Sequence, residues 1–241
     1  MLKFVYFDLY GTLVDVVTDE ASPATASCFA SWMARRYGPA AGRAEPIFQR
    51  IRGMGAGLEE YQEPDFDPVV HQYLADVIGR SPRQEEVAAC AAAFRECSRR
   101  RLALMPGAME CIGRLKDRFG LGLLSNAQAL LTLPELEALD LAGRFAPMVL
   151  SSDVGYKKPS ARIFDFALEE AGYPPDQVLH VGNDPFADVD GAVQCRIRTC
   201  RVRDPYFNGW YSQTAPDLFV EDLAELTMHL TGPDPPPWVT D

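Results

Sequence analysis

The sequence predicts an α/β fold in which a doubly wound, mostly parallel sheet carries an inserted all-helical subdomain. Short apolar segments, typical of strands buried on both faces, recur along the chain, and in its second half they alternate with helical patterns. Residues 16–100 instead show successive helical patterns with no convincing strand. We therefore expect an α/β core of residues 1–15 and 101–241, and a helical subdomain of residues 16–100.

The core is expected to contain five strands and four helices. The predicted strands cover 3–8, 121–125, 147–151, 178–182 and 197–202. The predicted helices cover 107–118, 134–141, 160–171 and 188–194, with Pro134 in a first helical turn. The proline-rich segment 231–241 is expected to be extended or loosely docked.

The helical subdomain is expected to contain four helices. They cover 22–37, 42–52, 67–79 and 85–103. Ser22 followed by Pro23 predicts an N-cap and a first turn, and Asp67-Pro68 repeats this arrangement. The glycine-spaced segment GMGAG at 53–57 follows no predicted strand, so we interpret it as a flexible loop and not as a dinucleotide-binding motif.

Composition indicates an ordinary globular protein. The formal net charge of −11 argues against nucleic-acid binding, because no basic excess exists to replace the counterions of phosphates. Asp8 interrupts the first apolar stretch, and no later window has membrane-spanning length, so we expect neither a signal peptide nor a membrane association. The six cysteines are scattered without a CxxC pair, which predicts free thiols in a cytoplasmic protein. The sequence does not indicate an oligomeric state.

Polar residues follow four of the five predicted strands. They are Asp8, Ser125 with Asn126, Lys157 and Lys158 before Pro159, and the group Asn183, Asp184 and Asp188. Taken singly, each is better explained as a helix cap or a solvated loop residue. Ligands of open parallel sheets bind beyond the carboxyl ends of the strands, so the four together predict an active site.

This order of motifs resembles the haloacid dehalogenase superfamily over residues 1–15 and about 104–205, with the helical insert at the place of the family's first-type cap. The resemblance implies that Asp8 is a nucleophile that forms a covalent ester. Thr12 and Ser125 would bind the transferred group, assisted by the Asn126 backbone. Lys158 would neutralise charge, and Asp184 and Asp188 would help to hold Mg²⁺, as in the family's phosphatases.

The same resemblance predicts an oxygen-rich Mg²⁺ site. Its expected ligands are Asp8, the backbone carbonyl of Tyr10, Asn183, Asp184 and Asp188. A hard cation prefers oxygen ligands and keeps several waters. A cation is also needed physically, because a carboxylate nucleophile repels a bound anion.

Two departures from the phosphatase pattern leave the reaction open. Tyr10 stands where phosphatases of the family carry an acid–base Asp, and D-x-Y-G-T is similar to L-2-haloacid dehalogenases, in which halide leaves without a proton. Asn183 stands where the phosphatases carry their first motif-four Asp. A Mg²⁺-dependent phosphatase acting on a small metabolite is slightly favoured. A metal-free haloacid dehalogenase and a weakened, ligand-binding or regulatory relative are the alternatives.

Substrate specificity is expected to come from the cap, in which no motif indicates a substrate. Arg50 and Arg52 are the nearest cationic candidates for substrate binding. Phe186, between Asp184 and Asp188, is a candidate for the wall of the entrance.

Overall fold

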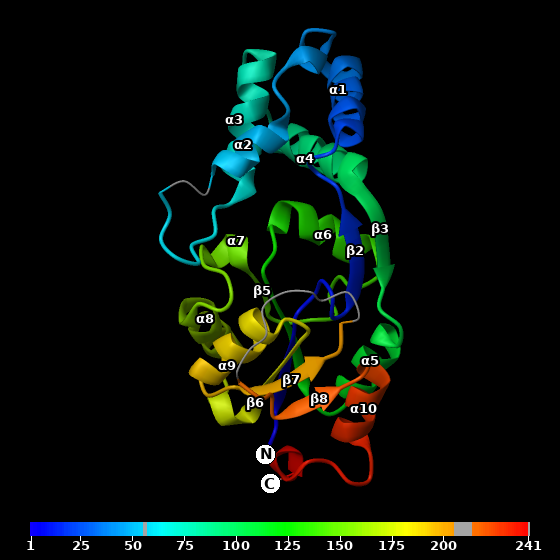
Figure 1. The fold of residues 1–241 in the computed structure, drawn as a ribbon, viewed down its shortest axis with the longest axis vertical. Helices are drawn as coiled ribbons and strands as arrows, with labels where there is room; N and C mark the ends of the chain where they lie inside the picture. The colour runs from blue at the N-terminus through cyan, green and yellow to red at the C-terminus, as the bar shows by residue number, and fades with distance from the viewer. Residues whose placement is uncertain (55–56, 205–213, 241) are drawn as a thin grey trace.

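The computed structural model describes residues 1–54, 57–204 and 214–240. Its largest sheet is parallel and six-stranded, with the order β5-β4-β1-β6-β7-β8. The strands are β1 (Phe4–Phe7), β4 (Gly120–Ser125), β5 (Met148–Leu150), β6 (Val178–Gly182), β7 (Arg198–Val202) and β8 (Leu218–Val220). Figure 1 shows this sheet at the end of the molecule where both termini lie. The parallel α/β prediction is confirmed.

Both faces of the sheet are covered, which explains why its strands are apolar throughout. Val5 and Phe7 of β1 belong to the large core cluster formed with α5 (Ala108–Leu115) and α10 (Leu223–Thr231). Phe4 and Tyr6 point to the other face and pack with residues of α8 (Ala161–Ala171). Alternate residues of a strand point to opposite faces, so β1 is buried from both sides.

Shorter elements complete the core. They are α6 (Ala129–Ala138), α7 (Ser151–Val154), the 3₁₀ turn η2 (Pro175–Gln177), the π-helical turn η3 (Pro185–Asp190), α9 (Gly191–Gln194) and α11 (Pro237–Thr240). Asp184 caps η3 by accepting hydrogen bonds from the N–H groups of Phe186 and Ala187. The predicted helix 188–194 is therefore a π-helical turn followed by a short α-helix.

Four helices lie at the opposite end of the molecule from the termini (Figure 1). They are α1 (Pro23–Tyr37), α2 (Ile47–Gly53), α3 (Phe66–Ile78) and α4 (Gln84–Ser98), with the 3₁₀ turn η1 (Ala41–Arg43) between α1 and α2. We refer to residues 23–98 as the helical group. It has a buried cluster of its own, which includes Phe29, Met33, Leu74 and Phe94. The division into a core and a separate cap stays a prediction.

A two-stranded antiparallel ribbon joins the helical group to the sheet. It pairs β2 (Val14–Thr18) with β3 (Arg99–Leu104). The predictions of no strand within 16–100 and of a helix to residue 103 were therefore wrong. The arginine-rich β3 alternates between half-buried and exposed residues, as an antiparallel ribbon with one solvated side does.

The helix ends were predicted with mixed success. Ser22 caps α1 through a hydrogen bond from the N–H of Thr25, as expected. The cap of α3 is Asp65 and not Asp67. Pro134 lies inside α6 and not in its first turn, because the helix already begins at Ala129.

One further expectation was wrong, and another is made more specific. Cys28 of α1 and Cys97 of α4 form a disulfide, although sequence spacing gave no sign that they meet. The C-terminal segment contains α11, with Val239 buried and the N–H of Leu2 donating to the carbonyl of Trp238, so this segment is docked. The GMGAG segment lies partly outside the described residues.

Candidate active site

The nucleophile candidate Asp8 directly follows β1, which lies between β4 and β6 in the interior of the sheet. Its main-chain N–H donates to the carbonyl of Val181 in β6 (2.8 Å), which fixes the strand end. Gly11 then turns the chain with a φ of 86°, and a Cβ there would lie 2.5 Å from the Nδ2 of Asn183. Only glycine fits this close approach, so the loop after Asp8 is held against β6.

Lys158 lies between two buried carboxylates. Its Nζ donates to Asp8 Oδ1 at 2.8 Å, to Asp188 Oδ1 at 2.6 Å and to the carbonyl of Leu124 at 2.8 Å. These three bonds use all three donors of an ammonium group. The side chain is only 2% exposed, so its charge is compensated by the two carboxylates and not by water.

Asp188 is fully engaged by neighbouring groups. Its Oδ1 accepts hydrogen bonds from Lys158 and from His180 (3.0 Å), and its Oδ2 accepts one from the N–H of Asp184 (2.9 Å). A carboxylate can only accept, so His180 donates from Nε2. A Cβ at Gly182 would lie 2.2 Å from the Asp188 carboxyl, which explains why the strand ends in glycine.

The pKa values follow from this burial and charge sharing. Burial raises the pKa of Asp8; Lys158 opposes this and Asp188 adds repulsion, and the net direction is upward. Burial disfavours the charged form of Asp188 as well, yet Lys158 and His180 hold its pKa well below the usual range. Burial lowers the pKa of His180, and Asp188 with Asp8 outweigh burial to raise that of Lys158. When Asp8 is ionised, the group of Asp8, Lys158 and Asp188 therefore carries one surplus negative charge.

Hydroxyl and amide groups orient both Asp8 and Lys158. Ser125, at the end of β4, donates to Asp8 Oδ1 (3.0 Å), and Thr12 makes a long contact with Oδ2 (3.4 Å). Asn126 makes a reciprocal pair with the main chain of Lys158: its Nδ2 donates to the carbonyl and its Oδ1 accepts from the N–H. The structure thus brings together Asp8, Thr12, Ser125, Asn126 and Lys158 as the sequence predicted, while their catalytic roles stay predictions.

Asn183 and Asp184 follow β6 on the other side of Asp8. Asn183 Oδ1 accepts a hydrogen bond from Thr12 (3.2 Å), and its Nδ2 donates to Asp204 (2.9 Å). The capping bonds of Asp184 engage its Oδ1. Asp184 therefore does not take the place of Asn183 through a one-residue shift. The Asn183 side chain faces the nucleophile, and Asp184 caps the next turn.

Tyr10 directs its hydroxyl to α6. It donates to Glu135 Oε2 at 2.6 Å and lies 3.1 Å from the hydroxyl of Thr132. Burial and the adjacent Glu135 raise the pKa of Tyr10 above its usual value of about 10. The phenol is thus a poorer acid than in water, and it is already committed to a carboxylate.

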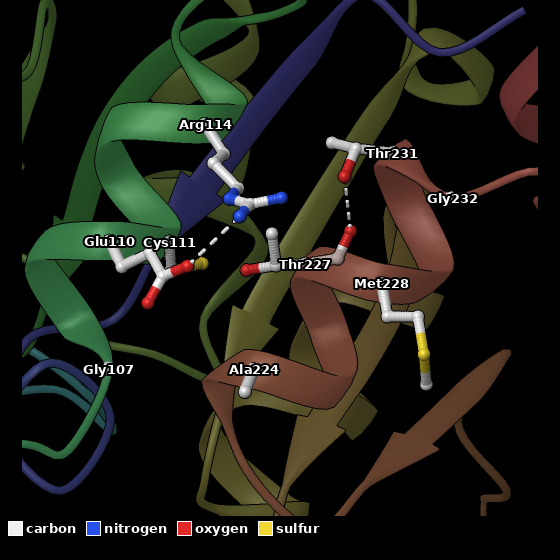
Figure 2. A pocket seen from close by; sticks show the side chains of 9 residues that line it. All are labelled: Gly107, Glu110, Cys111, Arg114, Ala224, Thr227, Met228, Thr231 and Gly232. Atoms are coloured by element: carbon white, nitrogen blue, oxygen red, sulfur yellow. Dashed lines mark hydrogen bonds and ion pairs between the residues drawn. The ribbon is translucent and has the colours of Figure 1, made fainter.

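These residues line a cavity of about 160 Å³. The side chains and turns around it belong to Asp8, Tyr10, Ser125, Asn126, Lys158, Asn183, Asp184, Ala187 and Asp188. Of the described residues that line it, three carry a carboxyl group and one an ammonium, so the cavity is negative when the carboxyl groups are ionised. A larger cavity of about 260 Å³ lies between α5 and α10, where Figure 2 shows small side chains and the Glu110–Arg114 ion pair. It contains none of the predicted residues.

The candidate substrate-binding residues do not line the active-site cavity. Arg50 pairs with Asp76 (2.6 Å) and lies over the Tyr73 ring, within the helical group. Arg52 is exposed on α2. Phe186 is 40% exposed and contacts the ring of Tyr61, whereas its neighbour Ala187 faces the cavity.

Comparison with known proteins places this geometry in a family. A family model described as haloacid dehalogenase-like hydrolase matches residues 2–196. The chain belongs to this family. It is therefore a hydrolase of the haloacid dehalogenase superfamily, as the order of its strand-end motifs predicted.

Proteins similar to this hydrolase in sequence include a phosphatase and a nucleotidase, and a dehalogenase shares its fold. The chain is 32% identical over 176 residues to phosphoserine phosphatase of Thermus thermophilus, covering 70% of this chain and 66% of that protein. It is 34% identical over 97 residues to the pyrimidine 5′-nucleotidase YjjG of Escherichia coli, and this match spans 43% of that protein's length. A solved 2-haloacid dehalogenase of Pseudomonas syringae is 24% identical and superposes with a TM-score of 0.63, over 94% of this chain and 96% of that one.

The donor atoms of the hydrolase suit a hard cation only in part. Within the described ranges, no three or more His, Cys, Asp or Glu side chains are grouped so that they could hold a metal ion. Both oxygens of Asp188 are already engaged, which makes it a poor ligand. Asp8, Asp184, the Asn183 amide oxygen and the main chain of Tyr10 remain as oxygen donors beside a cavity of negative charge. They fit a Mg²⁺ ion that keeps several waters.

Three residues near the site were not predicted from the sequence. His180 donates a hydrogen bond to Asp188. A single histidine in a buried strand gave no sequence signal of this contact. Glu135 of α6 accepts the hydrogen bond of the Tyr10 hydroxyl, and no sequence motif marks this glutamate. Gln128 contacts the helical group, and no sequence pattern indicates this. Separately, among the described residues no helix combines the length and apolarity needed to cross a membrane.

Proposed function

We propose that this hydrolase cleaves a small phosphate ester or acyl phosphate through a covalent ester at Asp8, with Mg²⁺ bound. The observation that carries the proposal is the charge of the cavity, where Asp8, Asp184 and Asp188 face the single ammonium of Lys158. An anionic substrate is repelled by this surplus until a further cation is present. The names of the two relatives that match by sequence, a phosphoserine phosphatase and a pyrimidine 5′-nucleotidase, support the same choice.

Asp8 Oδ2 is the proposed attacking atom. Oδ1 already accepts strong hydrogen bonds from Lys158 and Ser125, whereas Oδ2 has only the 3.4 Å contact with Thr12. Attack on phosphorus would form the Asp8–phosphate ester and release the leaving group. Water would then attack the phosphorus, releasing phosphate and restoring the carboxylate. Lys158 and the hydroxyl of Ser125 would offset the charge of the transferred group.

Mg²⁺ would be held by Asp8, Asn183, Asp184 and the carbonyl of Tyr10, and it would supply positive charge between nucleophile and substrate. We assign Asp188 a different task. Its two oxygens hold Lys158, His180 and the turn at Asp184, so it would fix the ammonium beside Asp8. The cap assignment for the helical group belongs to this proposal as well.

The leaving group sets the substrate class. Tyr10 would have to protonate a leaving alkoxide, but its hydroxyl is bound to Glu135 and its pKa is raised. General acid catalysis typically contributes about 10²–10⁴-fold. We therefore expect substrates that leave without a proton, such as acyl or aryl phosphates, to react much faster than alkyl phosphates.

A haloacid dehalogenase is the second candidate, and the orientation of Tyr10 favours it. In that reaction Asp8 would displace halide from carbon, and the halide needs no proton. The neutral Asn183 beside Asp8 is compatible with such a site. Against this candidate, the carboxylate of a haloacid would approach Asp184 and Asp188 at close range.

The test compares three substrates, each with Mg²⁺ and with a chelator. They are p-nitrophenyl phosphate, an alkyl phosphate and 2-chloropropionate. We expect Mg²⁺-dependent release of p-nitrophenol, little alkyl-phosphate turnover, and no turnover in Asp8→Asn. Chloride release that survives chelation would establish the dehalogenase instead. Inactivity on all three would favour a weakened, ligand-binding relative.

A further inference from the structure

The carboxylate of Glu135 is buried outside the reaction cavity, between the helical group and the loop that carries Asp8. It is 3% exposed. Arg95 of α4 donates to it from Nε (2.7 Å) and Nη2 (3.2 Å), and Tyr10 donates its hydroxyl at 2.6 Å. A single carboxylate thus binds Arg95 of the helical group and Tyr10 of residues 8–14, which we call the nucleophile loop, and Arg99 of β3 lies 3.7 Å away as a weaker cationic partner.

Removal of only one partner of Glu135 is expected to cost free energy. A buried carboxylate is stable when its partners satisfy its charge, and the removal of one partner leaves that charge uncompensated. Burial lowers the pKa of Arg95 but the contacts with Glu135 and Tyr10 outweigh it, so the guanidinium stays charged. Separation of α4 from α6 would remove the nearer cation from Glu135 and leave Tyr10 and the more distant Arg99 as its partners.

The helical group contacts α6 at its start and in its middle. Gln128, just before the helix, accepts from the N–H of Phe66 (2.9 Å) and donates to Glu63 (2.7 Å) and to the carbonyl of Pro64 (2.9 Å). Leu130 and Leu131 pack against the buried cluster of the helical group. Since α6 follows Ser125 and Asn126 within a few residues, it is the core element on which the helical group rests.

A segment of residues 59–66, which we call the strap, makes a second contact with the core. The N–H of Glu63 donates to the carbonyl of Gly155, and the N–H of Lys157 donates to the carbonyl of Tyr61, both at 2.8 Å. These bonds lie directly before Lys158. The strap and Glu135 therefore reach the reaction centre from two sides.

We propose that Glu135 is a positioning residue that couples closure of the helical group to the geometry of the nucleophile loop. With the helical group closed, Arg95 fixes Glu135, Glu135 fixes the Tyr10 side chain, and the Tyr10 main chain holds its place beside Asp8. When Arg95 withdraws, the Tyr10 hydroxyl loses its fixed acceptor and the loop loosens. The inference rests on the proposed function only in calling this loop catalytic.

Amide hydrogen exchange tests the coupling without any substrate. The amides of Gly11, Leu13 and Val14 are hydrogen-bonded within the nucleophile loop and report its opening. We expect Arg95→Met to accelerate their exchange at least tenfold, although Arg95 contacts none of these amides in the described hydrogen bonds. In a Tyr10→Phe background, which keeps the ring but removes the hydroxyl, Arg95→Met should add less than threefold.

Two variants guard against misfolding and nonspecific loosening. Arg95→Lys keeps the charge but loses the paired contacts, so its effect should be intermediate. Arg114→Met removes the exposed Glu110–Arg114 pair between α5 and α10 (Figure 2) and should leave loop exchange unchanged. Strap amides of Glu63 and Phe66 should also exchange faster in Arg95→Met.

Kinetics then links the coupling to the reaction. On p-nitrophenyl phosphate, Tyr10→Phe and Arg95→Met should each lower kcat more than they raise KM, and the double variant should be no worse than about threefold below the poorer single variant. Loop exchange unchanged in Arg95→Met, or fully additive effects in the double variant, would overturn the proposal. Inactivity of the wild type would instead refute the proposed function and leave the exchange result valid.

Discussion

Asp8, Lys158 and Asp188 form a chain of two negative charges around one positive charge, all buried. The pKa of Asp8 is raised, so ionisation of its carboxyl is harder in the native state than in the unfolded chain. Its contribution to stability therefore falls as the pH rises from the normal carboxyl range towards the raised pKa, and the ionised group opposes folding. The free-energy cost of a buried, ionised Asp8 would serve catalysis and does not serve folding.

Asp8→Asn is accordingly expected to abolish hydrolysis and to raise Tm at pH 7. The amide is nearly isosteric and removes the surplus charge, while Lys158 keeps Asp188. Thermal melts at pH 7 with and without Mg²⁺ measure this, and Mg²⁺ should raise Tm more in the wild type than in the variant. A lower Tm for Asp8→Asn than for wild type would show that the surplus charge is already neutralised.

Lys158→Met should destabilise the protein strongly. It leaves two buried carboxylates without their shared cation, and breaking a buried ion pair from one side costs about 3–5 kcal/mol. The neighbouring Lys157 is the matched control, because its side chain is exposed and its Nζ makes only a long ion pair, 3.8 Å, with the Glu63 carboxylate. Lys157→Met should change the free energy of unfolding by less than about 0.5 kcal/mol in urea titrations. Equal effects of the two substitutions would contradict the charge-sharing geometry.

At this scale the sequence predicted the residues of the core better than those of the helical group. Asp8 and Ser125 are placed by strand ends, which all lie at one edge of a parallel sheet, and Lys158 lies in the loop that follows β5 and α7. Arg50 and Phe186 depend on how a helix or turn faces its neighbours, and this follows from distant packing. Arg50 turned to Asp76 for that reason. Tyr10 was noticed, but its acceptor Glu135 lies 125 residues away in sequence.

Among the elements, α4 shows most clearly how a helix end depends on a buried acid. Glu86 accepts from the N–H of Arg83 at 3.0 Å and pairs with Arg80 at 2.7 Å. The hydrogen bonds from Arg80 and from the Arg83 backbone lower the pKa of Glu86 to about 2. The ionised group thus stabilises the start of α4 at pH values above its unfolded pKa of about 4.3.

Glu86→Gln should therefore lower Tm by an amount that depends on pH. The difference from wild type should be full at pH 6–7, where Glu86 is ionised in both states, and should shrink as the pH falls from about 4 towards 2. Melting curves across this range measure it. Glu85→Gln, at the adjacent exposed pair with Arg83, is the control and should show little pH-dependent difference. A Glu86 difference that is constant with pH would rule out an ionic origin.

Element boundaries were predictable where local chemistry decides them. Ser22 capped α1 as its side chain predicts, because the N-cap bond is made within three residues. The ribbon of β2 and β3 was not predictable, since its strands pair across about 80 residues and each is polar on one side. The three-residue β8 carries too little pattern to separate it from a loop.

For the molecule as a whole, the disulfide between Cys28 and Cys97 is the main addition to the expected fold. It joins residues 69 apart and links the first and last helices of the helical group. A crosslink of this span restricts the unfolded chain, and its loss costs about 2–5 kcal/mol. Scattered cysteines gave no indication of this pairing, because their proximity arises only when α1 packs on α4.

The double variant Cys28→Ser, Cys97→Ser should lower Tm, by roughly 2–4 °C for each kcal/mol lost in a chain of this size. A dithiol reductant should lower the wild-type Tm by a similar amount and leave the double variant unchanged. Cys195→Ser, at a free thiol, is the control. Alkylation under native, non-reducing conditions that labels Cys28 would show that the two sulfurs are not bonded.

The chain enters the helical group through β2 and leaves it through β3, and these paired strands have one irregularity, between Val17 and Thr18 opposite Arg99. Such an interruption bends a strand and weakens the ladder locally. If the helical group moves as one body, we expect a single degree of freedom: rotation about an axis across the ribbon at Thr18. One interprobe distance between the tip of α3 and the sheet would then describe the whole motion.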